Sequence, residues 1–128
     1  MASHIPALPS VPADRAATVA KAALRAAARL DLANGTLARI IGVSEASASR
    51  MAQGAYRLDP DAKPFELALL FMRLFRSLDA ITGGDEAAAR AWLRADNTAL
   101  GGKPIDMILR ISGLLDVIGY LDARRAVV

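Results

Sequence analysis

The chain has 128 residues, which is enough for one compact domain or two small helical ones. It contains no cysteine, which excludes disulfides, thiolate metal sites and cysteine nucleophiles and fits a reducing compartment. Hydrophobic residues make up 54% of the chain but aromatic residues only 5%, because 28 residues are alanine. This composition favours helices over a β-sandwich or a β-barrel. The net charge of +3 selects no partner by itself.

The first segment, residues 1–12, contains three prolines and no periodicity, which predicts a flexible arm. It lacks the basic start and the long apolar stretch of a secretory signal. The longest uninterrupted apolar run, residues 67–72, is much shorter than the about 20 residues of a membrane span. We therefore expect a soluble, cytoplasmic protein with no membrane partner.

A first helix is predicted over residues 13–32. Its apolar positions recur at helical spacing and form one stripe, made of Val19, Ala23, Ala26 and Leu30. Basic residues at steps of four form a second stripe, made of Lys21, Arg25 and Arg29. The basic stripe is either an ordinary solvated face or part of a contact surface.

Two short helices are predicted over residues 36–41 and 44–53. Thr36 and Ser44 are expected to cap them, because a side-chain hydroxyl accepts a bond from a free backbone N–H of the first turn. Gly42 lies between the helices and tolerates the positive φ of a tight turn. This arrangement predicts a helix-turn-helix.

The packing pattern of this segment agrees with a helix-turn-helix. Two short helices that cross at a steep angle need a small residue at the crossing, and Ala38 lies there. They also need apolar residues before and after the turn and on the inner face of the second helix, which are Leu37, Ile41, Val43, Ala48 and Met51. An unrelated helical hairpin with a glycine turn is the alternative.

In a helix-turn-helix, the second helix enters the major groove of DNA. Arg50 can contact guanine or phosphate, and Gln53 can pair with adenine. Glu45 either accepts a bond from cytosine or stabilises the start of its own helix, whereas Thr36 and Ser44 can offer helix N-termini to phosphates. The candidate DNA-binding residues are Thr36, Arg39, Ser44, Glu45, Ala46, Ser47, Ser49, Arg50 and Gln53.

The charge distribution supports a nucleic-acid surface in this half of the chain. Residues 15–57 carry a net charge of +5, whereas residues 58–128 carry −1. A charge of +5 is a modest footprint for DNA, so we expect weak binding by one copy and useful affinity from a dimer or a larger assembly.

The second half begins after a linker predicted at residues 58–64. The helix expected over residues 65–81 is apolar nearly all round, so it is either the centre of the fold or part of an oligomer interface. Asp85 is expected to cap a helix that ends near Ala95, and a glycine-containing loop follows. Pro104 opens another helix, Ser112 and Gly113 interrupt it, and the last helix is predicted over residues 114–125.

Together these elements predict an all-α protein. A helix-turn-helix domain over residues 13–57 precedes a second, small helical domain over residues 65–128 that contains an exposed glycine loop. Catalytic motifs are missing from the sequence. The lone His4 excludes a histidine pair for zinc, and Gly101, Gly102 and Lys103 lack the frame of a phosphate-binding loop. We therefore expect no enzyme activity, no metal and no cofactor.

The run from Trp92 to Leu121 resembles the toxin-binding domain of the MbcA/ParS/Xre antitoxins. The family pattern matches here at Trp92, Leu93, Asn97, Leu100, Gly101, Gly102, Pro104, Leu109, Gly113, Val117 and Leu121. The residue before Gly113 is serine, where the family often has proline, alanine or glutamate. The upstream helix-turn-helix extends the resemblance over most of the chain.

The resemblance implies the antitoxin of a type II toxin–antitoxin system. Such an antitoxin inhibits an NAD-depleting RES-domain toxin with its C-terminal part and represses its own operon by binding operator DNA. It also implies a homodimer or a hetero-oligomer with the toxin. The candidate toxin-binding residues are Trp92, Asn97, Thr98, Leu100, Gly101, Gly102, Lys103, Pro104, Arg124 and Arg125. The alternative is a plain dimeric helix-turn-helix regulator with no toxin partner.

Overall fold

The computed structural model describes residues 11–127, and the side chains of residues 15–126. This part of the chain forms helices and no strand, which confirms the all-α prediction. The helices are α1 (Val11–Arg29), α2 (Asn34–Ile41), α3 (Glu45–Ala52), α4 (Lys63–Ile81), α5 (Glu86–Arg94), α6 (Pro104–Met107) and α7 (Ile111–Val127). The arm predicted at residues 1–12 lies outside the described residues, except that α1 already begins at Val11. Within the described range, none of the helices is long and apolar enough to cross a membrane.

Helix α1 ends at Arg29, earlier than the predicted end at residue 32. The backbone of Asp31 adopts the left-handed conformation with φ of 58°. The N–H of Leu32 then donates to the carbonyl of Ala27 at 2.8 Å, and the N–H of Asp31 donates to Ala28 at 3.1 Å. This is a Schellman ending, which glycine usually forms, so an aspartate at this position does not signal the helix end.

The helix-turn-helix is present, with one cap placed differently. Helix α2 begins at Asn34, so Thr36 lies inside its first turn and the predicted Thr36 cap is wrong. The capping position belongs to Ala33, whose extended backbone starts the helix without a side-chain bond. Ser44 caps α3 as predicted, because its hydroxyl accepts from the N–H of Ser47 at 3.0 Å. Gly42 takes the expected left-handed conformation, with φ of 79°.

The predicted packing pattern of α2 and α3 is confirmed. The residues predicted at the crossing, before the turn and on the inner face of α3 are all buried: Ala38, Leu37, Ile41, Ala48 and Met51. Val43, directly after the turn, is partly buried against the same core. The short helices are therefore held by tertiary packing, as helices of this length require.

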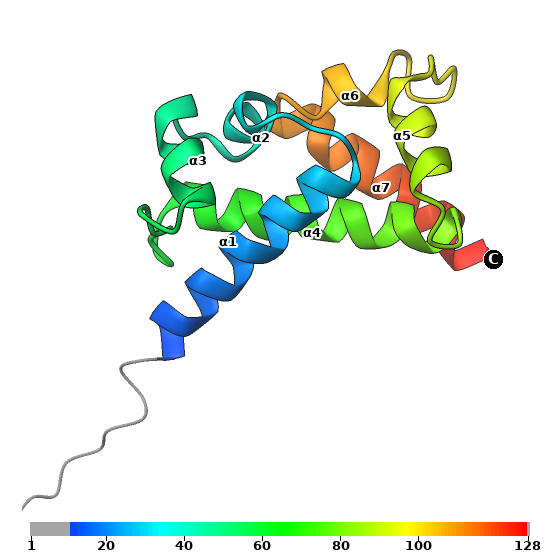
Figure 1. Cartoon of the computed structure of the whole chain (residues 1–128). Helices are drawn as coiled ribbons and strands as arrows, with labels where there is room; N and C mark the ends of the chain where they lie inside the picture. The colour runs from blue at the N-terminus through cyan, green and yellow to red at the C-terminus, as the bar shows by residue number, and fades with distance from the viewer. Residues whose placement is uncertain (1–10, 128) are drawn as a thin grey trace, which may run out of the picture.

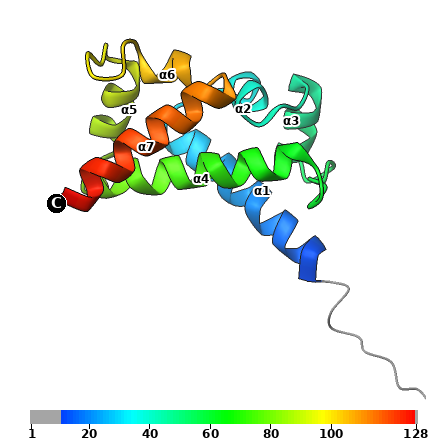
Figure 2. The same cartoon turned by 180° about the vertical axis from the view of Figure 1, so that it is seen from behind.

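Helix α4 is the centre of the fold. Helix α1 crosses one side of it and α7 lies across the other, as the two opposite views show (Figure 1, Figure 2). Phe71, Leu74 and Leu78 are fully buried in α4, and α2 also packs against this helix, where Leu67 lies beside Gly42. Of the two interpretations of this apolar helix, a place at the centre of the chain's own core is the one the structure supports.

Two arginines of α5 bind the end of α1. Arg90 donates from Nε to the carbonyl of Arg29 at 2.8 Å. Arg94 donates to the carbonyls of Leu30 at 3.1 Å and Asp31 at 2.8 Å. The last carbonyls of a helix lack partners within the helix and carry partial negative charge, so cations are well placed there. We call Arg90 and Arg94 the α5 arginine pair.

An ion-pair cluster strengthens the same contact. Arg29 pairs with Glu86 of α5 at 3.0 Å and with Asp79 of α4 at 3.5 Å. Its guanidinium also lies 4.9 Å from the ring centre of Phe75. One member of the predicted basic stripe is thus used inside the fold, whereas Lys21 and Arg25 stay exposed.

The C-terminal helices depend on one close approach at Gly113. The predicted interruption at Ser112 and Gly113 is wrong, because both residues lie in the first turn of α7 and the break falls at residues 108–110. A Cβ at Gly113 would overlap the backbone carbonyl of Met107 in α6. Glycine is required there by packing and does not break the helix.

Two glycines of α7 provide a matched test of this packing. Gly113→Ala should lower the free energy of unfolding by about 2–3 kcal/mol, because the new methyl group must displace backbone. Gly119→Ala should raise it by about 0.5–1 kcal/mol, since a Cβ there meets no atom within 4 Å and alanine favours the helix. Urea unfolding of both variants measures the difference, and equal effects would contradict the close α6–α7 contact.

Candidate nucleic-acid and partner interfaces

The outer face of α3 presents most of the residues predicted to contact DNA. Glu45, Ala46, Arg50 and Gln53 are exposed, and Ser49 is partly exposed. Outside α3, the exposed candidates are Arg39 on α2 and Ser44 in the turn, and Thr36 is half-buried. The exposed members meet the first condition of a contact surface, which is access to solvent.

Ser47 is a correction to the predicted outer face. It is buried, and its hydroxyl accepts from Arg50 at 3.1 Å and bonds to the Ser44 hydroxyl at 2.9 Å. The helical period places Ser47 at the edge of the exposed stripe of α3, on the side of the buried residues Ala48 and Met51. Ser47 therefore holds Ser44 and Arg50 in place and is not available to a base.

Arg50 is exposed but already positioned. One of its amino groups donates to Ser47, and the guanidinium lies 5.9 Å from the ring centre of Tyr56. A guanidinium has five N–H donors, so most remain for a ligand. Because its side chain is held before binding, Arg50 loses less conformational freedom when it makes a contact.

Glu45 contacts its own chain. A Cβ at Gly35 would lie 3.2 Å from the Glu45 carboxylate, so this carboxylate sits beside the first turn of α2. A negative charge there is favourable, and Glu45 is also in the first turn of α3. The position favours the helix-start interpretation of Glu45 over a cytosine contact, and it opposes phosphate binding near Thr36.

Two basic residues that the helix-turn-helix motif did not predict as DNA contacts lie beside the α3 surface. Lys21 of α1 and Arg57, which follows α3, line one hollow of about 370 Å³ together with Gln53. Both are exposed. The signal was present in the sequence as the +5 charge of residues 15–57, but only the fold brings these cations beside the end of α3.

The glycine loop after α5 is organised by Asn97. Its carbonyl accepts from the N–H groups of Gly101 at 2.8 Å and Gly102 at 3.2 Å, and its N–H donates to Gly102 at 2.9 Å. Its side chain accepts from the N–H of Leu100 at 3.0 Å. Asn97 therefore shapes the loop from inside, whereas Thr98, Gly101 and Lys103 are exposed on it. Gly101 has φ of 84°, which glycine adopts readily.

Other predicted toxin-binding residues serve the core. Pro104 is fully buried, so the prediction that it contacts a partner is wrong; its ring opens α6 and packs inside. Trp92 is partly buried and stacks on Tyr120 with ring centres 6.2 Å apart, and Leu100 packs against the core. Arg124 lies over the same Tyr120 ring.

Sequence reasoning missed two exposed apolar residues at the start of α7. Ile111 is 58% exposed and Leu115 is 49% exposed, and they are the large hydrophobic side chains exposed among residues 15–126. The predicted last helix begins at residue 114 and therefore leaves Ile111 outside it. In the structure both residues lie in α7, one helical turn apart.

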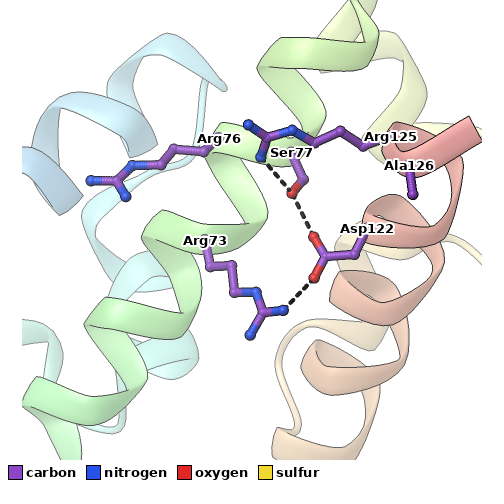
Figure 3. Close-up of a pocket in the computed structure, with 6 residues that line it drawn as sticks. All are labelled: Arg73, Arg76, Ser77, Asp122, Arg125 and Ala126. Carbon is purple, nitrogen blue, oxygen red and sulfur yellow. Dashed lines mark hydrogen bonds and ion pairs between the residues drawn. The ribbon is translucent and has the colours of Figure 1, made fainter. Parts of the chain in front are cut away.

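A polar groove lies farther along α7, between α4 and α7 (Figure 3). Arg73 pairs with Asp122 at 2.6 Å, and the hydroxyl of Ser77 donates to the same carboxylate at 2.7 Å. Arg125 donates to Ser77 at 3.4 Å. The Ser77 hydroxyl bond, together with the charge of Arg73, lowers the pKa of Asp122 below its ordinary value of 3.8.

Two family models match the chain. One, described as an antitoxin Xre-like helix-turn-helix domain, matches residues 9–73. The other, described as the antitoxin Xre/MbcA/ParS C-terminal toxin-binding domain, matches residues 77–126. A search among curated proteins gave no match. The first match contains the α3 surface, the second contains the glycine loop and most of α7, and the two meet within α4.

The Asp122 ion pair gives the stability a dependence on pH. Because the pKa of Asp122 is lowered in the folded state, its contribution is complete above the ordinary value of 3.8 and is lost as the pH falls through the lowered pKa. Asp122→Asn should cost about 1 kcal/mol at neutral pH, since solvent screens part of the pair. Denaturant unfolding from pH 7 down to acid should show this difference shrinking, and a difference independent of pH would contradict the assignment.

Proposed function

Because the chain belongs to the antitoxins of the Xre/MbcA/ParS type, with a helix-turn-helix domain and a toxin-binding domain, we propose that its toxin is a RES-domain enzyme that depletes NAD. We also propose that it represses its own operon. The observation that carries the proposal is the occurrence of both domains in one chain, each with an exposed candidate surface.

The DNA contact is proposed for the outer face of α3. Arg50 and Gln53 supply the donors and acceptors that distinguish base pairs in the major groove. Arg39, Lys21 and Arg57 supply phosphate contacts, which fix the register of the protein on the duplex. Ser44, Ala46 and Ser49 line the same face and are small enough to allow close approach.

The toxin contact is proposed for the C-terminal half. Thr98, Gly101 and Lys103 are exposed on the loop, and small residues allow the backbone of a partner to come close. Asn97 and Gly102 keep that loop in shape. We propose that this half covers the active site of the toxin, so that NAD is excluded from it.

The two activities are proposed to use separate surfaces. Helix α3 lies near one end of α4, and α5 and the end of α7 lie near the other (Figure 1). A single helix-turn-helix with a modest charge binds DNA weakly, so repression would use a homodimer or an assembly with the toxin. The alternative, a plain dimeric regulator, requires DNA binding and dimers but no toxin.

Co-expression with the toxin encoded beside this gene tests the proposal. The antitoxin should co-purify with that toxin and keep cellular NAD high. Arg50→Ala should weaken operator binding by about 1–3 kcal/mol if it contacts a base, while protection from the toxin is unchanged. Band shifts and an NAD assay measure the two effects. If the neighbouring gene product neither binds this protein nor lowers cellular NAD, the alternative of a plain dimeric regulator is supported.

A second variant separates base contacts from phosphate contacts. Arg57→Ala should weaken binding to operator and to unrelated DNA equally, and it should reduce the salt dependence of binding. Arg50→Ala should instead lose discrimination between the two DNAs. Identical behaviour of the two variants would contradict the placement of α3 in the major groove.

A further inference from the structure

Gly119 in the middle of α7 has no packing role among the residues that the structure describes. It is exposed, lies in regular helix, and a Cβ there would meet no atom within 4 Å. Glycine inside a helix lowers its stability relative to alanine. Gly113 in the same helix is explained by its contact with α6, but nothing in the described chain explains Gly119 in this way. A surface glycine of this kind permits close approach by another backbone.

The exposed apolar residues of α7 lie on the same face as Gly119. Ile111, Leu115 and Gly119 follow each other at steps of four, so they form one stripe along the helix. Asp122 and Ala126 continue this face for the next two turns. The stripe from Ile111 to Ala126 is about 22 Å long at the rise of an α-helix.

The far end of this stripe opens into the groove between α4 and α7. The groove has a volume of about 600 Å³, and its lining contains Arg73, Arg76 and Arg125 with Asp122 as its one carboxylate. Arg76 makes no hydrogen bond or ion pair with the described residues and extends away from Asp122 (Figure 3). The groove therefore carries a net charge of about +2, which an anionic group can balance.

We propose that the toxin docks an α-helical segment on this face, with its apolar side over Ile111, Leu115 and Gly119 and acidic side chains at the arginine groove. The proposal rests on the proposed function, because it assigns the surface that meets the toxin. It shifts the main contact from the glycine loop to α7 and the neighbouring part of α4. Apolar residues supply the buried area, and carboxylates bind guanidinium groups in a directional way.

The same surface fits a second copy of the chain poorly. A parallel pair of α7 helices would bring the arginine grooves of both copies together. An antiparallel pair would lay Ile111 and Leu115 on the charged groove of the partner. DNA phosphates would match the arginines but not the apolar stripe. An acidic, amphipathic helix satisfies both parts of the surface.

Variants of the full-length antitoxin test the surface against the purified toxin from the same operon. Gly119→Leu should weaken toxin binding at least 10-fold while raising the melting temperature by about 2–5 °C, because the helix gains propensity in open space. Leu115→Ser and Arg76→Glu should each weaken binding at least 5-fold. Wild-type binding should also weaken as salt rises, and Arg76→Glu should reduce that dependence.

Matched controls are Ala87→Leu, on the exposed side of α5, and Lys63→Glu, at the other end of α4; both should bind the toxin like the wild type. If the wild type binds the toxin and every variant binds it with the same affinity, the docking surface is overturned and the proposed function stays intact. A wild type that does not bind the toxin overturns both. A change in the oligomeric state of the free antitoxin, or in DNA binding, with toxin affinity unchanged would assign the face to a second copy or to DNA and overturn the proposal.

Discussion

The burial of α4 on opposite sides is the constraint on which the rest of the structure depends. Phe71, Leu74 and Leu78 are fully enclosed because α1 and α2 cover one side of this helix and α7 covers another. Removing the helices on either side would expose a large apolar surface of α4. The free energy cost is about 25 cal/mol for each Å² of apolar surface that becomes exposed to water. The helix-turn-helix and the C-terminal helices therefore share one core, although the two family matches meet within α4.

The α5 arginine pair adds a polar connection to that apolar core. Arg90 and Arg94 donate to carbonyls at the end of α1 that have no partner within the helix. Arg29 of α1 forms an ion pair with Glu86 of α5 across the same contact. The turn after α1 leads directly into α2, so the same bonds fix where the helix-turn-helix begins. The glycine loop follows α5, so this loop and the helix-turn-helix are both connected to the contact between α1 and α5.

Periodicity and capping chemistry made most of the fold predictable from sequence. The local signals were the apolar stripe of α1, the apolar residues on nearly all sides of α4, and the Ser44 and Asp85 caps. Each of these features is present in the structure. Non-local contacts were not predictable. The Schellman turn at Asp31 uses a residue that rarely takes positive φ. The burial of Pro104 inside the fold does not follow from the helix-start pattern that suggested it, whereas the burial of Ser47 agrees with the helical period of α3 and its bonds are to residues three positions away. Gly113 and Gly119 look alike in sequence, and only the position of Met107 separates them.

Native-state hydrogen exchange of the free antitoxin tests most directly whether one core carries both surfaces. If α4 is shared, the slowest amides of α2, α4 and α7 should exchange with the same free energy of opening, within about 1 kcal/mol, because they open only when the whole chain unfolds. Denaturant should then shift all three sets together. If the amides of α2 exchange through an opening that leaves α7 protected, or the reverse, the chain contains two independent units and the account of a single shared core is wrong.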